Sequence, residues 1–102
     1  MKIIKKLSEM LDEEIGDARK YADNAVEYKD MEPDLAETFA ELSREELGHV
    51  GKLHEQVISF IKRAQESGKE IPKGMMEIYE YLHKRQIERV GEVKIILAQL
   101  RE

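Results

Sequence analysis

The feature that most constrains this chain is an apolar stripe with helical spacing, which runs through three long segments and is interrupted at only two places. The interruptions contain both prolines, Pro33 and Pro72, which fit a first helical turn, and Gly68, which suits a left-handed helix end. The segments between them are rich in Glu, Lys, Leu, Ala and Arg, which favour helices. The pattern therefore predicts an all-α protein without a sheet. We expect its helices at about residues 2–29, 34–67 and 74–101.

The connections between these segments are short, and short connections make neighbouring long helices antiparallel. We therefore expect an antiparallel helical hairpin followed by a third long helix, within one domain that spans residues 1–102. A chain of 102 residues buries only about two-thirds of the surface that its unfolded form exposes. A deep functional site in such a chain is expected to need a second copy, so a homo-oligomer is the default prediction.

Composition and charge narrow the classes of protein further. The absence of cysteine excludes disulfide scaffolds and thiolate metal sites. The formal net charge of −5 comes from interspersed signs, so no basic face is expected for nucleic acid, and cations are the more natural partners. No apolar run is long enough for a signal peptide or a membrane span, which predicts a cytoplasmic protein without a membrane partner.

Carboxylates interrupt the apolar stripes at two positions, Glu14 and Glu46. The first stripe consists of Ile4, Leu7, Leu11, Glu14, Ala18, Tyr21, Ala25 and Tyr28. The second stripe consists of Leu35, Phe39, Leu42, Glu46, His49, Leu53, Val57, Phe60 and Ala64. An unpaired buried carboxylate costs several kcal/mol, and converging carboxylates cost more through repulsion, so a neutralising partner is required. Antiparallel packing through the turn at 30–34 would bring Glu14 to the level of residues 46–50.

Glu46 and His49 form an E-x-x-H pattern, which places a carboxylate oxygen and an imidazole nitrogen about one turn apart on the same helix face. This pair of donors is one that a divalent metal prefers. The competing interpretation is that the glutamates of the stripes lie at a rim or pair with Lys or Arg. The coincidence of Glu14, Glu46 and His49 at one level favours a metal site in which all three are ligands and catalytic groups.

Four other residues are weaker candidates. Glu80 and His83 form a second E-x-x-H pattern, but the third apolar stripe leaves His83 at its flank and Glu80 farther out. That stripe consists of Met75, Tyr79, Leu82, Gln86, Val90, Val93, Leu97 and Leu100. His54 also flanks its stripe, without a spaced carboxylate, and is interpreted as a surface or snorkelling side chain. Tyr21 could bring its phenol near a metal-bound ligand, although core packing explains this residue as well.

The three favoured residues supply two carboxylates and one imidazole, which is half of a carboxylate-bridged dinuclear centre. A two-fold partner would supply the other half. Two hairpins would then form a four-helix bundle, in which Glu14, Glu46 and His49 of each chain surround two metal ions per dimer. Four carboxylates would balance two divalent ions, so the centre would be electrically neutral.

The residues around these positions resemble those of the ferritin-like superfamily, most closely its rubrerythrin-type and encapsulated-ferritin half-bundles. The resemblance covers about residues 7–66. It is carried by Glu14 with Tyr21 seven residues later, by Pro33-Asp34-Leu35 at the start of the second helix, and by Arg44-Glu45-Glu46-Leu47-Gly48-His49. The fold that the resemblance implies is a dimeric four-helix bundle.

The resemblance also implies a function. It assigns Glu14 to one iron, Glu46 to a bridge between two irons, and His49 to a terminal ligand position. Such centres oxidise Fe(II) to Fe(III) with oxygen or peroxide, for iron storage or detoxification. The sequence lacks the second hairpin of a full ferritin, the Cys-based iron domain of rubrerythrin, and the C-terminal encapsulin-targeting tail that encapsulated ferritins usually carry. Loading into an encapsulin shell is therefore not expected.

Two other functions fit the residues. One is a non-catalytic helical assembly or scaffold, in which buried charges set the orientation of the partners. The other is a mononuclear zinc or manganese site within one chain, completed by His83. Carboxylate and imidazole ligands accept iron, manganese and zinc, so the choice of iron follows from the resemblance alone. The third helix could cover the hairpin or join dimers into a ring.

Overall fold

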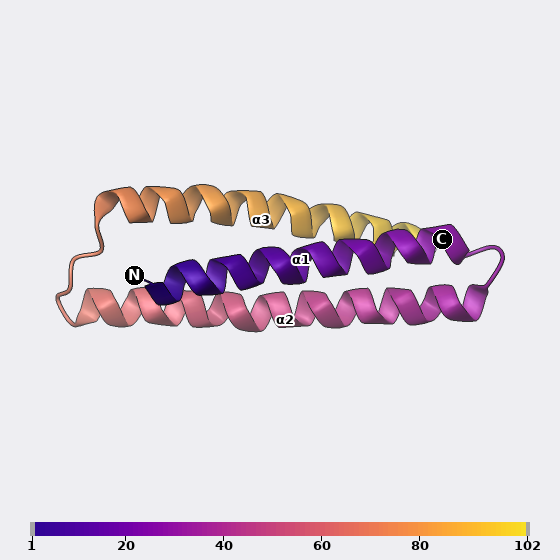
Figure 1. The fold of residues 1–102 in the computed structure, drawn as a ribbon, viewed down its shortest axis with the longest axis horizontal. Helices are drawn as coiled ribbons and strands as arrows, with labels where there is room; N and C mark the ends of the chain where they lie inside the picture. Colours follow the sequence, from indigo (N-terminus) through magenta and orange to yellow (C-terminus); the bar gives the residue numbers. More distant parts are fainter. Residues whose placement is uncertain (1, 102) are drawn as a thin grey trace.

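A computed structural model describes residues 2–101 of the chain, which form three α-helices. The helices are α1 (Lys2–Tyr28), α2 (Pro33–Glu66) and α3 (Lys73–Gln99). They run antiparallel to their sequence neighbours along an elongated body of 56 × 19 × 18 Å (Figure 1). Residues 2–101 contain no strand. The all-α class and the order of the helices are therefore confirmed, and the predicted bounds agree within two residues at every end.

The residues at the two breaks act as predicted, except that Pro72 is the N-cap residue just before α3 and not part of its first turn. Pro33 begins α2, where its missing N–H has no intrahelical partner to lose. Gly68 follows the end of α2 with a φ of 74°, a conformation that costs glycine little. There the N–H of Gly68 donates to the carbonyl of Gln65, and the N–H of Lys69 donates to the carbonyl of Ala64. This pair of bonds is a Schellman motif, which ends the helix and satisfies its last carbonyls.

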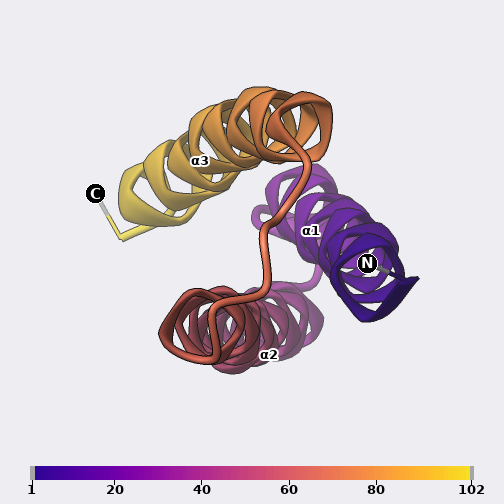
Figure 2. The ribbon, with the colours of Figure 1, turned by 90° about the vertical axis from the view of Figure 1, so that its left-hand side faces the viewer.

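Helix α1 lies between the other two helices, as the end-on view shows (Figure 2), and it packs more extensively against α2 than against α3. Helices α2 and α3 contact each other only slightly. Because α1 has a neighbour on two sides, its buried face is wider than the single stripe that the sequence predicts. Ile15 and Ala22, which lie outside the predicted stripe, are fully buried in α1.

The first half of α2 packs through small residues, which corrects the predicted stripe. Ala36, Ala40 and Ser43 are buried, whereas Leu35 is 42% exposed. The hydroxyl of Ser43 donates a 2.7 Å hydrogen bond to the carbonyl oxygen of Ala18 on α1. A direct bond to the neighbouring backbone needs a close approach of the two helices, and small side chains allow it. The stripe of α2 is therefore rotated away from Leu35.

Polar contacts join α3 to the N-terminal half of α1. Gln86 is buried on the predicted stripe of α3, and its Nε2 donates to Ser8 Oγ at 3.3 Å and to Asp12 Oδ1 at 3.1 Å. Arg89 pairs with the same carboxylate at 3.2 Å. Val93, also on α3, packs among the alanines of α1. These contacts hold α3 against one side of α1 and leave the opposite side of the α1–α2 hairpin uncovered.

Candidate metal centre

Three predicted ligands converge midway along the hairpin, where α1 and α2 run side by side. His49 Nδ1 lies 3.3 Å from Glu14 Oε2 and 3.6 Å from Glu46 Oε2. One ligand atom of each residue lies within 4.8 Å of the others. The antiparallel register expected from the turn at 30–34 thus brings residue 14 to the level of residues 46–49. Two carboxylates and one imidazole at this spacing can bind a divalent cation.

The three side chains are less buried than their places in the predicted stripes imply. The side chain of Glu46 is 20% exposed, that of Glu14 is 27% exposed and that of His49 is 54% exposed. The reason is the position of α1, whose fully buried stripe follows Ile15 and Ala18 and so leaves Glu14 at its edge. The cluster lies at the border of the α1–α2 contact and opens onto the side without α3.

The basic side chain that lies against the two carboxylates is His49. The ion pairs among residues 2–101 include no Lys or Arg on Glu14 or Glu46. The arginine nearest in sequence, Arg44, pairs instead with Glu37 at 2.9 Å. The interpretation of these glutamates as partners of Lys or Arg is therefore not supported.

The carboxyls of Glu14 and Glu46 influence each other's ionisation. The pKa of the Glu46 carboxyl is raised, first by its hydrogen bond to Glu14 and then by burial and by the charge of Glu14. The pKa of Glu14 is lowered, first because it accepts the hydrogen bond from Glu46 and then through His49. Two adjacent carboxylates cannot both ionise without cost, so the proton of the pair is held more readily by Glu46. A bound divalent cation would favour the ionised form of both carboxylates.

The raised pKa of Glu46 predicts a pH-dependent effect of Glu46→Gln on the metal-free protein. Folding favours the protonated form of Glu46, so its contribution to stability is present at low pH and is lost as the pH rises through the folded-state pKa. Glutamine imitates the protonated form at every pH. We expect the variant to be as stable as the wild type at about pH 4 and to unfold at a higher urea concentration than the wild type at about pH 7. Urea unfolding of chelator-treated samples at both pH values measures the difference. A difference that stays constant between the two pH values would contradict the raised pKa of Glu46.

The weaker candidates lie outside the cluster. The ring of His83 stacks on that of His54, with centroids 4.4 Å apart. His54 is half-buried, so it is partly covered and not a fully exposed surface side chain. Glu80 is exposed. Tyr21 stacks on Phe39 with ring centroids 6.3 Å apart, which is the core-packing alternative. The group of potential metal ligands found within residues 2–101 contains neither Glu80 nor His83.

An apolar surface surrounds the cluster, and the sequence analysis did not single it out. Side chains that share the helix faces of Glu14 and Glu46 at 100° per residue are only partly covered. We call this surface the free hairpin face, and its apolar residues are Ile3, Leu7, Met10, Tyr21, Tyr28, Leu35, Leu42, Leu53 and Phe60. Among them Met10 is 38% exposed, one turn before Glu14. The sequence feature that indicates this face is the continuation of both predicted stripes on either side of the carboxylates.

Comparison with protein-family models, with curated proteins and with solved structures finds no match to this chain. Within residues 2–101, no helix is both long enough and apolar enough to cross a membrane. The candidate site therefore rests on its own geometry and on the residues that carry the ferritin-like resemblance.

Proposed function

We propose that this protein is an iron-binding ferritin-like protein, with a di-iron centre completed across a homodimer interface and with ferroxidase activity for iron storage or detoxification. The observation that carries the proposal is the convergence of Glu14, Glu46 and His49 without a Lys or Arg partner among residues 2–101. Helical bundles build di-iron sites from Glu residues and E-x-x-H pairs on facing helices, and α1 and α2 together carry one half of such a set.

The free hairpin face supports a second copy as the source of the other half. Its apolar residues flank the cluster on both helices, and α3 covers the opposite side of α1. Pairing two such faces about a two-fold axis would remove apolar surface from water and bring the two clusters together. The dimer would then hold two Glu14, two Glu46 and two His49 side chains around two ions. Four carboxylates balance the charge of two Fe(II) ions.

The donor set fits ferrous iron as a substrate. Carboxylate oxygens and imidazole nitrogens bind Fe(II), and the negative carboxylates stabilise Fe(III) more strongly. In the proposed reaction each Fe(II) loses one electron to oxygen or peroxide. By the resemblance, Glu14 holds one iron, Glu46 bridges the two, and His49 occupies a terminal position. Ionised carboxylates are required, so a proton held by Glu46 must leave before iron binds.

The test is the addition of Fe(II) under anaerobic conditions, followed by air, with Fe(III) formation read from the optical absorbance. We expect about one iron per chain, bound before air is admitted, and oxidation faster than in protein-free buffer. Protein loaded with Ca²⁺ serves as the control for non-specific binding to the acidic surface. A site that offers only oxygen ligands, without redox chemistry, would bind Ca²⁺ as well as Fe(II).

Indifference to iron would support the scaffold alternative, in which the cluster serves only to orient helices. Tight binding of zinc or manganese to a single chain, without acceleration of iron oxidation, would support a mononuclear site. His83 could then complete that site only by leaving its stack with His54.

A further inference from the structure

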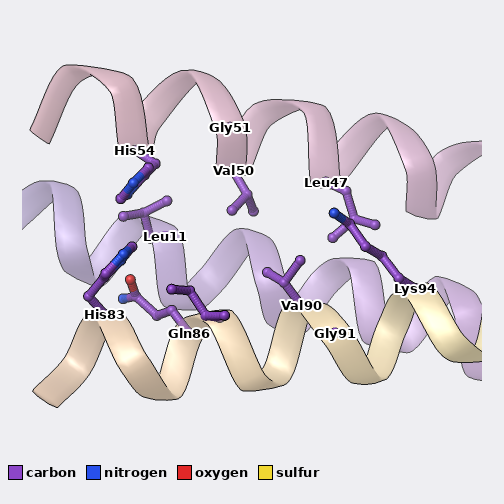
Figure 3. A pocket seen from close by; sticks show the side chains of 11 residues that line it. Leu11, Leu47, Val50, Gly51, His54, His83, Gln86, Val90, Gly91 and Lys94 are labelled. Carbon is purple, nitrogen blue, oxygen red and sulfur yellow. The ribbon is translucent and has the colours of Figure 1, made fainter. Parts of the chain in front are cut away.

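A groove of about 450 Å³ lies between α2 and α3, with α1 behind it (Figure 3). It lies beside α3, whereas the metal cluster lies on the side of the hairpin that α3 leaves uncovered. Its walls are mainly apolar and include Leu11 from α1, Leu47 and Val50 from α2, and Ile87 and Val90 from α3. Pockets of this size and character commonly hold small ligands, with a few polar groups that fix the ligand's orientation.

Side chains mark both ends of the groove. At one end the parallel rings of His54 and His83 stack across the gap, with centroids 4.4 Å apart. At the other end Lys94 extends from α3 towards Leu47 on α2 (Figure 3). His83 and Lys94 are eleven residues apart, which is about 16 Å along α3 at 1.5 Å per residue. A helix with its side chains is about 10 Å wide, and the stacked histidines cross the groove at one end, so the shape fits a slender chain.

The charged lining of the groove has one sign. Its ionisable residues are Lys94, His54 and His83, and no carboxylate lines it, although the chain contains 22 acidic residues. Burial, followed by the charge of His54, lowers the pKa of His83. The lowered pKa favours the uncharged form of His83, so Lys94 marks the cationic end of the groove. An apolar slot with one cationic end complements an apolar chain that carries one negative charge.

Two glycines line the groove, Gly51 on α2 and Gly91 on α3 (Figure 3). Glycine inside a helix costs about 1 kcal/mol relative to alanine, so it usually reflects a close approach. Here a Cβ at either position would meet nothing within 4 Å. Close packing of the helices therefore does not require these glycines. Because they have no side chain, they leave the space in the groove open.

We propose that the groove between α2 and α3 binds a fatty-acid-like carboxylate, with the carboxylate at Lys94 and the acyl chain along Leu11, Val50 and Val90 towards the paired histidines. The ligand is held by apolar burial along the chain and by one charge-assisted bond at Lys94. The site is separate from the metal cluster, so it does not depend on the proposed iron chemistry.

The first test compares three twelve-carbon probes that differ in head group: dodecanoate, 1-dodecanol and dodecyltrimethylammonium. Each is titrated below its micelle concentration, and binding is measured by displacement of an environment-sensitive fluorescent fatty acid. We expect dodecanoate to bind at least about ten-fold more tightly than dodecanol, and the cationic probe to bind most weakly. Equal affinities for the three probes would overturn the role of Lys94, and the absence of dodecanoate binding would overturn the site.

Variants of groove residues test whether the probe binds in the groove. Gly91→Leu fills the open space, and we expect at least about ten-fold weaker dodecanoate binding, whereas the control Gly74→Leu lies on α3 outside the groove and should bind as the wild type does. Lys94→Gln should reduce dodecanoate binding to the level of dodecanol and leave dodecanol unchanged. Helical circular dichroism confirms folding, and Gly91→Leu should retain its iron binding.

Two further outcomes would overturn the proposal. Unchanged dodecanoate affinity in Gly91→Leu would place the probe elsewhere. A wild type that binds no dodecanoate, with a smaller oligomer for Gly91→Leu in sedimentation, would show that a second copy of the chain occupies the groove. Failure of the iron experiment would not contradict ligand binding in the groove, because no residue is shared between the two sites.

Discussion

Glu46→Ala is expected to reduce Fe(II) retention and the rate of Fe(II) oxidation by at least about 100-fold, because mutating even the outer partners of metal ligands commonly costs 10–100-fold. Glu46 lies within reach of both other ligands, and in the proposed centre it bridges the two irons. Its loss would leave two carboxylates and two histidines per dimer, which can neither bridge the ions nor balance their charge. The rate of Fe(III) formation after air is admitted and the iron retained after desalting measure the effect.

Glu45→Ala is the matched control for this variant. Glu45 is the adjacent residue, carries the same charge, is exposed and lies outside the cluster. It should retain both iron and oxidation within about two-fold, since an exposed charge contributes little by itself. If the two alanine variants lost activity equally, the effect would come from the acidic surface in general, and the assignment of Glu46 as a ligand would fail.

Leu35→Arg is expected to convert the proposed dimer into monomers and, with it, to abolish iron binding. Leu35 is 42% exposed on the free hairpin face, and α3 does not cover it. It precedes Glu46 by eleven residues, which is about 16 Å along α2, so the new guanidinium cannot pair directly with the cluster. Two unpaired arginines in the proposed interface would carry a desolvation cost of several kcal/mol. Sedimentation and iron content, measured on the same sample, report the two losses.

The matched control for Leu35→Arg is Ile95→Arg. Ile95 is 60% exposed on α3, away from the free hairpin face and outside the lining of the groove. It should leave both the oligomer and its iron unchanged. A Leu35→Arg variant that became monomeric but kept its iron would show that one chain binds the metal without a partner, which is the mononuclear alternative.

The helices could be predicted from the sequence because their ends depend on local chemistry. Pro33 and Gly68 each act through their own backbone geometry, whatever the helices pack against. The register of the hairpin could also be predicted, since a short turn leaves little freedom in how two long helices align. This is why Glu14 was expected at the level of Glu46 and His49, and the three residues do lie together.

Which face of each helix is buried was harder to predict, because it depends on the neighbours of each helix. The helical periodicity of α1 predicted a single buried stripe. Helix α1 contacts two helices, however, and its buried face shifts towards Ile15. In α2 the small residues Ala40 and Ser43 allow a close approach that an analysis favouring large apolar residues does not detect. Both shifts move Glu14 and Glu46 from the centre of a stripe to its edge.

The pairing of His54 with His83 could not be predicted from spacing. Each histidine flanks its own stripe, and only the placement of α3 against α1 brings the two rings together across the groove. Periodicity identifies the faces of a helix, whereas contacts between helices that are distant in sequence depend on how the whole chain packs.

The most direct test of the central claim is native mass spectrometry of the protein loaded with Fe(II) under anaerobic conditions. The claim is that Glu14, Glu46 and His49 form half of a centre that a second chain completes. We predict a species of two chains with two irons, which Glu46→Ala does not form. A single chain that carries iron, or a dimer that remains free of metal when iron is in excess, would contradict the account.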